Sequence, residues 1–93
     1  MQVHIGSHTL LRAEERGTCE AEILDVLGNG FSIPAKYGKL GKAKVYPFDR
    51  LRHGKHYWQK RVEVYYFLEA DALITVTVYV FFGTWEGQRA DSL

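Results

Sequence analysis

The first thirty residues predict two short helices, the first from its capping and stop residues and the second from an apolar pattern with helical spacing. The first helix is expected to end at Arg16, because Gly17 readily adopts the left-handed conformation that stops a helix. Thr18 is a natural N-cap for the second helix, and Gly28-Asn29-Gly30 ends it. The apolar stripe that we expect to be buried consists of Ala21, Leu24 and Leu27, with Ile23 beside them.

After the second helix, the pattern changes to the two-residue alternation that is typical of β-strands. Phe31 to Ala35 and Ala43 to Phe48 are short candidates, and each contains a proline, which favours an edge or a bulge. Asp49 to Lys55 is polar and predicts a turn. Two long runs of β-branched and aromatic residues predict the main strands: His56 to Glu69 and Ala72 to Gly83.

Hydrophobic matching predicts how these two long strands pair. A three-residue turn, Glu69-Ala70-Asp71, places Leu68 opposite Ala72 and gathers the apolar side chains on one face. A two-residue turn would instead put Arg61 and Glu63 on the apolar face of the partner strand. We therefore expect the longer turn, with a semi-polar opposite face made of Arg61, Glu63, Tyr65, Thr75, Thr77 and Tyr79.

Together these elements predict an α+β fold, in which two N-terminal helices pack on one face of a twisted antiparallel β-sheet. The length supports one domain, residues 1–93, with an ordered core from about residue 5 to residue 86. The longest uncharged run, Ala72 to Trp85, is shorter than the roughly 20 residues that span a bilayer. Without a signal peptide, and with Cys19 as the lone cysteine, we expect a cytoplasmic protein that does not contact membranes.

The formal net charge of +1 conceals an uneven distribution along the chain. Residues 1–35 sum to −3, residues 36–61 to +8 and residues 62–93 to −4. A basic stretch of this kind indicates an anionic partner, such as nucleic acid. The alternative is a lysine-rich surface that keeps the protein soluble and has no partner.

None of the short motifs predicts a cofactor or a metal. Gly38-Lys39-Leu40-Gly41-Lys42 lacks the spacing and the final Ser or Thr of a phosphate-binding loop. His53 and His56 have no cysteine nearby and are only two ligands, whereas a zinc site needs three or four. Cys19 lies next to acidic residues that oppose thiolate formation, so we expect a structural role for it.

Basic and aromatic residues are interleaved in the second half of the chain. Cations for phosphates and aromatic rings for unstacked bases are the combination that proteins use to bind RNA. The alternative is that Tyr65 and Tyr79 are half-buried partners across two strands, with Arg61 shielding Tyr79 by a cation–π contact. The residues concerned are Tyr57, Trp58, Lys60, Arg61, Tyr65 and Tyr79.

The segment Ser7-His8-Thr9-Leu10-Leu11-Arg12-Ala13-Glu14-Glu15-Arg16-Gly17, with Glu22-Ile23-Leu24-Asp25-Val26-Leu27-Gly28-Asn29-Gly30 after it, resembles a family of small prokaryotic domains. These domains look like relatives of the RelE, ParE and BrnT toxins of toxin–antitoxin pairs, and the likeness covers most of residues 7–86. The resemblance implies a RelE-like domain whose open sheet face holds mRNA on the ribosome. It also implies metal-free cleavage, in which the 2′-hydroxyl of the RNA attacks the phosphate. The usual first strand is lacking unless Gln2 to Ile5 forms it.

From this resemblance we expect a toxin-family protein that binds RNA and acts as a metal-independent endoribonuclease. Lys60 and Arg61 would stabilise the phosphate charge, and His8 or Tyr79 would serve as the acid or base. The expected RNA-binding residues are Arg12, Lys36, Lys39, Lys42, Lys44, Arg50, Arg52 and Tyr65. The alternative is a non-enzymatic interaction module, in which an edge strand pairs with a cognate antitoxin or with a second copy in a homodimer. Convergence of the expected catalytic residues on one cleft would favour the enzyme.

Overall fold

A computed structural model describes residues 1–85 of the chain, and its elements confirm the α+β fold class. The five strands form one sheet in the order β1-β5-β4-β3-β2. The pairings β2–β3, β3–β4 and β4–β5 are antiparallel as predicted, whereas β1 runs parallel to β5 and makes the sheet mixed. The elements are β1 (Gln2–His4), α1 (Ser7–Arg16), α2 (Glu20–Asn29), β2 (Phe31–Ile33), β3 (Leu40–Arg52), β4 (Lys55–Glu69) and β5 (Ala72–Gly83).

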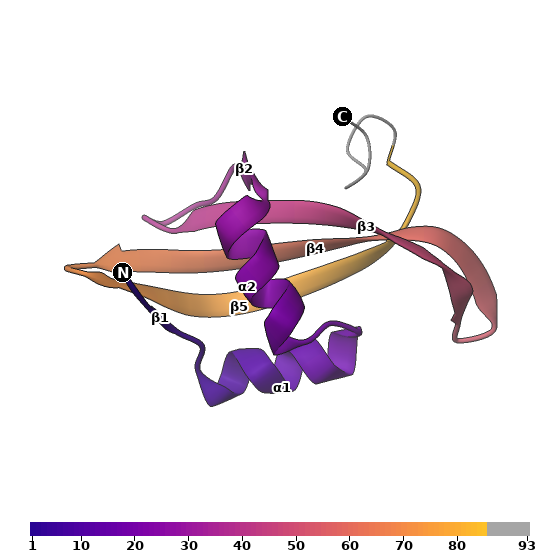
Figure 1. Cartoon of the computed structure of the whole chain (residues 1–93), viewed down its shortest axis with the longest axis horizontal. Coiled ribbons are helices and arrows are strands. Elements are labelled where there is room, and N and C mark those ends of the chain that lie inside the picture. The colour runs from indigo at the N-terminus through magenta and orange to yellow at the C-terminus, as the bar shows by residue number, and fades with distance from the viewer. Residues whose placement is uncertain (86–93) are drawn as a thin grey trace.

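The two helices lie differently on the sheet. α2 crosses one face over β3 and β4, whereas α1 runs alongside β5 (Figure 1). We call the face under α2 the helix face and the opposite one the open face. The apolar core lies between the helices and the helix face, and it consists of Ala13, Ile23, Val26, Leu27, Val62, Val64, Tyr66, Leu73 and Val78.

The end of α1 is as predicted, because Gly17 adopts a left-handed conformation with a φ angle of 95°. The start of α2 differs, since Cys19 occupies the N-cap position and the Thr18 hydroxyl donates to Glu22 at 2.7 Å. The buried stripe is also rotated: Leu24 is 44% exposed and Ala21 is exposed, whereas Ile23, Val26 and Leu27 are buried. In the part of the chain that the structure describes, no helix is long and apolar enough to cross a membrane.

The turn between β4 and β5 contradicts our predicted register. A two-residue turn pairs Glu69 with Ala72, and a bulge between Tyr65 and Tyr66 then shifts the pairing by one residue. Beyond the bulge, Val64 faces Val78, so the apolar side chains still meet. The predicted register fails because the bulge gives the hairpin two registers, one on each side of it. As a consequence, Thr75 lies on the helix face, where its hydroxyl donates to that of Thr9 at 3.1 Å.

β3 and β4 continue beyond the end of β5 as a two-stranded extension, residues 47–58, which we call the arm. Our prediction of a turn over Asp49 to Lys55 is wrong, because β3 runs on to Arg52 and only His53-Gly54 forms the turn. Both turn residues have positive φ angles, 51° and 79°, as tight hairpin turns require. The arm curves toward α1 (Figure 1), and Arg52 there donates to the Glu15 carbonyl at 3.3 Å.

Candidate nucleic-acid interface

Two lysines of β3, Lys42 and Lys44, lie on the helix face and bind α2. Lys42 Nζ donates to the Leu27 carbonyl at 3.1 Å, near the C-terminal end of the helix, where carbonyls carry partial negative charge. Lys44 Nζ lies 2.7 Å from the Asp25 carboxylate, to which the Tyr46 hydroxyl donates at 2.6 Å. Hydrogen bonds from Lys44 and then Tyr46 lower the pKa of Asp25 to about 2. Both lysines therefore fasten α2 to the sheet, and their placement does not support the expected contact with RNA.

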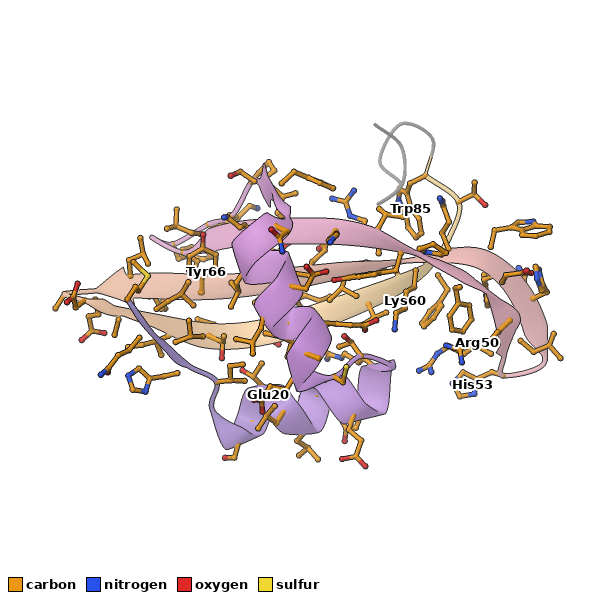
Figure 2. The ribbon with its side chains drawn as sticks, in the orientation of Figure 1. Glu20, Arg50, His53, Lys60, Tyr66 and Trp85 are labelled. Atoms are coloured by element: carbon orange, nitrogen blue, oxygen red, sulfur yellow. The ribbon has the colours of Figure 1, made fainter. Side chains whose placement is uncertain are left out.

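Lys60 is also a structural residue in this fold. It is only 8% exposed, and its Nζ lies 2.8 Å from the Glu22 carboxylate and 2.9 Å from the Gly17 carbonyl, to which it donates. Figure 2 shows it beside α2, on the side toward the arm. These contacts hold the α1–α2 connection against β4. The ammonium is thus occupied within the fold, whereas we expected it to stabilise a phosphate.

The expected catalytic residues do not converge. Lys60 and Arg61 are consecutive on β4, so their side chains leave opposite faces of the sheet. His8 is exposed in the first turn of α1, about 12 Å along the helix axis from Arg16. It is Arg16 that lies over the Tyr79 ring, at 4.7 Å from its centroid, and its Nη1 donates to a β5 carbonyl at 2.7 Å.

The remaining expected cations of the helices and the arm lie away from Tyr79. Arg12 is paired with Glu15 on α1 at 2.8 Å. Arg50 stacks on Phe48 within the arm, and Arg52 stacks on Phe82, each at 4.7 Å from the ring centroid. Figure 2 shows Arg50 and His53 together in the arm, at the opposite end of the sheet from Tyr66.

The arm histidines do not form a metal site. His56 Nε2 lies 2.7 Å from an exposed Asp49 carboxylate, and its ring packs edge-on against Trp58. Among residues 1–85, no group of three or more His, Cys, Asp or Glu side chains could hold a metal ion. The pair is therefore a local polar contact of the arm.

The centre of the open face carries a short hydrogen-bonded row on β4. Arg61 Nε donates to one oxygen of Glu63 at 2.9 Å, and the Tyr65 hydroxyl donates to the other at 2.9 Å. Burial, and then the bond to Glu63, raise the pKa of Tyr65 to about 12, so the phenol keeps its proton. The Arg61 guanidinium lies over Phe31 at 5.4 Å, whereas we considered Tyr79 as its partner.

Beside this row, the segment before β3 and the open face enclose a cleft of about 320 Å³. We call it the tyrosine cleft, because Tyr37, Tyr65 and Tyr79 all line it. Gly41 lies under the Tyr65 ring, and a Cβ atom there would approach that ring to 3.0 Å. The full lining is Pro34, Ala35, Lys36, Tyr37, Lys39, Tyr65, Thr77 and Tyr79.

The structure thus brings four of the expected residues together at the cleft: Lys36, Lys39, Tyr65 and Tyr79. Tyr37 was not among the expected site residues, and Thr77 had no expected role there. A signal for Tyr37 was present, because Tyr37-Gly38 between lysines is a turn composition, and both residues have positive φ angles.

Comparison with protein-family models, curated proteins and solved structures finds no match for this chain. The resemblance to RelE-like toxins therefore stays a prediction. The function has to be inferred from the geometry of the open face itself.

Proposed function

We propose that the protein binds single-stranded RNA on the open face of its sheet, with the tyrosine cleft at the centre. The observation that carries this proposal is the lining of the cleft, where three tyrosines meet two lysines, Lys36 and Lys39. Aromatic rings stack on unstacked bases, and cations bind the adjacent phosphates. A single strand can present free base faces to these rings, which a duplex cannot do. The resemblance to RelE-like toxins also favours RNA as the ligand.

Binding has more support here than cleavage. A general acid or base must reach the reacting phosphate, and a phosphate-binding cation must be accessible to it. Lys60 is bound to Glu22 and Gly17, and the Tyr65 hydroxyl already donates to Glu63. Cleavage is therefore a separate outcome of the binding experiment and is not needed for the proposal.

The test is fluorescence anisotropy with a labelled single-stranded RNA and the matching duplex, over a series of salt concentrations. Two phosphate contacts predict a slope of about −1.4 for log K against log salt, at about 0.7 per contact with a single strand. Lys36→Gln combined with Lys39→Gln should bring the slope close to zero. Lys55→Gln, which changes an exposed lysine of the arm, should leave it unaltered.

Two results would overturn the proposal. One is absence of binding by the folded wild-type protein at low salt, and the other is equal binding by the double lysine variant. Gel analysis of the same RNA after incubation shows whether it is cleaved. Cleavage that survives in the double variant would place the reaction outside the tyrosine cleft.

A further inference from the structure

Tyr37, which lines the tyrosine cleft, lies in a tight turn and is strongly exposed to solvent. Its φ angle is +59°, a left-handed conformation that bulky residues rarely adopt, and its side chain is 86% exposed. The Lys39 amide donates to the Lys36 carbonyl at 3.2 Å, which closes a tight turn around it. The turn accounts for the positive φ angle, and it presents a large aromatic ring of the cleft lining to solvent.

The other two tyrosines of the cleft are already packed against neighbours. Tyr65 and Tyr79 meet edge to face, with ring centroids 5.9 Å apart, and Tyr79 also lies beside Phe81 at 6.4 Å. In the described part of the chain, the ring contact recorded for Tyr37 is with the Lys39 ammonium, at 6.0 Å. Tyr37 is therefore the most exposed of the three tyrosines that line the cleft, and no other aromatic ring of the described chain packs against it.

The size of the cleft limits what it can hold. About 320 Å³ lies at the small end of the range of roughly 300–1,000 Å³ for small-molecule pockets, which suits one nucleoside. The Thr77 hydroxyl in the lining can donate to and accept from a base edge. Lys36 and Lys39 supply positive charge for the phosphate attached to that nucleoside.

We propose that the tyrosine cleft takes one unstacked nucleobase, which Tyr37 covers from one side while Tyr65 and Tyr79 support it from the other. This inference rests on the proposed function, and it names the part of the RNA that enters the cleft. A free nucleotide has the same chemistry as a nucleotide within a strand, so the experiment compares both.

The experiment uses short single-stranded RNAs that contain 2-aminopurine, whose fluorescence falls when the base stacks on an aromatic ring. The wild-type protein and Tyr37→Phe should both quench it. Tyr37→Leu should lose most of the quenching and bind the RNA about 5- to 150-fold more weakly, as expected for the loss of one base–aromatic stack. Leucine and tyrosine are both strained by the positive φ angle at this position. The substitution therefore removes the aromatic ring and leaves the strain of the loop unchanged. Trp58→Leu, which removes an exposed ring of the arm, is the matched control and should change neither signal.

The outcomes separate the two proposals. The base clamp is overturned, and RNA binding is left intact, when the wild-type protein binds RNA and Tyr37→Leu binds it with the same affinity and the same quenching. Failure of the folded wild-type protein to bind any RNA or free 2-aminopurine nucleotide would overturn both proposals. Quenching of the free nucleotide, without binding of RNA oligomers, would support the base site and remove RNA as its ligand.

Discussion

Replacement of Lys60 by methionine should destabilise the fold and leave RNA binding intact, although the sequence suggested a catalytic role for this lysine. The substitution keeps an unbranched side chain of similar length, removes the ammonium and replaces the Cδ methylene by sulfur. Two acceptors then lose their donor: the Gly17 carbonyl and the Glu22 carboxylate. Glu22 retains the hydrogen bond from Thr18, so it is not left entirely unpaired.

The expected loss follows from the burial of this group. The Lys60 side chain is 10% exposed and that of Glu22 is 24% exposed, so water screens the pair only in part. Hydrogen bonds to charged groups contribute about 1.5–3 kcal/mol each, and the variant no longer has to desolvate an ammonium. We expect a net loss of about 2–3 kcal/mol in the free energy of unfolding, which corresponds to roughly 10–20 °C in Tm for a domain of this size.

Urea denaturation followed by circular dichroism measures this loss as a lower midpoint with an unchanged m-value. Lys55→Met, at an exposed position of the arm, is the control and should change the free energy of unfolding by less than about 0.5 kcal/mol. Adding Glu22→Gln to Lys60→Met should cost less than Glu22→Gln does in the wild-type protein, because the two groups interact directly. A Lys60→Met protein with wild-type stability and abolished RNA binding or cleavage would refute this reasoning.

Three further predictions concern the contact between α2 and the sheet and the side chains of the open face. Because the native pKa of Asp25, about 2, is below its ordinary value of 3.8, the stabilisation from this carboxylate is complete above about pH 4 and is lost as the pH falls toward 2. Urea midpoints should therefore fall more steeply over this range in the wild type than in Asp25→Asn, and equal slopes would contradict the assignment. Gly41→Ala should weaken RNA binding, since the added Cβ would lie 2.9 Å from Ile33 and 3.0 Å from the Tyr65 ring; wild-type affinity in a folded variant would argue against a role for that ring. Tyr65 should titrate near pH 12 by ultraviolet absorbance, and Glu63→Gln should lower this pKa only in part, because burial is the larger cause; a full return to the ordinary value of 10 would show that Glu63 dominates.

The sequence predicted the elements that depend on local signals. Gly17 ends α1, and the two long alternating runs form β4 and β5 nearly as predicted. Such signals need only neighbouring residues, because a helix stop or a strand alternation is a property of a short segment. The region Gln2 to Ile5, left open by the sequence, contains β1 from Gln2 to His4, and a parallel pairing with β5 fixes it.

The register of the β4–β5 hairpin depends on a bulge, and the sequence does not reveal one. Val76 is the extra residue of β5, since Tyr66 faces Thr75 and Tyr65 faces Thr77. One inserted residue reverses which side chains reach the core, so it moves Thr75 to the helix face and keeps Val78 there. A pattern that is matched with a single register cannot represent this change of face.

The placement of Lys60 was available from the sequence, whereas that of Lys42 and Lys44 required the tertiary fold. Lys60 follows the same two-residue spacing as the buried Val62 and Val64, so alternation alone assigns it to the core side of β4. Lys42 and Lys44 reach the helix face only because β3 pairs with β4 in the observed register. There they meet a helix carbonyl and a helix carboxylate of α2.

This distribution changes how the charge of +8 over residues 36–61 should be interpreted. Lys42, Lys44 and Lys60 bind partners in α2 and in the turn before it, and Arg52 is engaged with α1 and Phe82. At the tyrosine cleft, only Lys36 and Lys39 among its lining residues are cationic. In the RNA binding that we propose, few phosphate contacts imply a shallow dependence on salt, so aromatic stacking would have to supply most of the affinity. A basic segment in the sequence is therefore not the same as a basic surface, and the aromatic residues of the open face are better indicators of the ligand than the lysines that first suggested it.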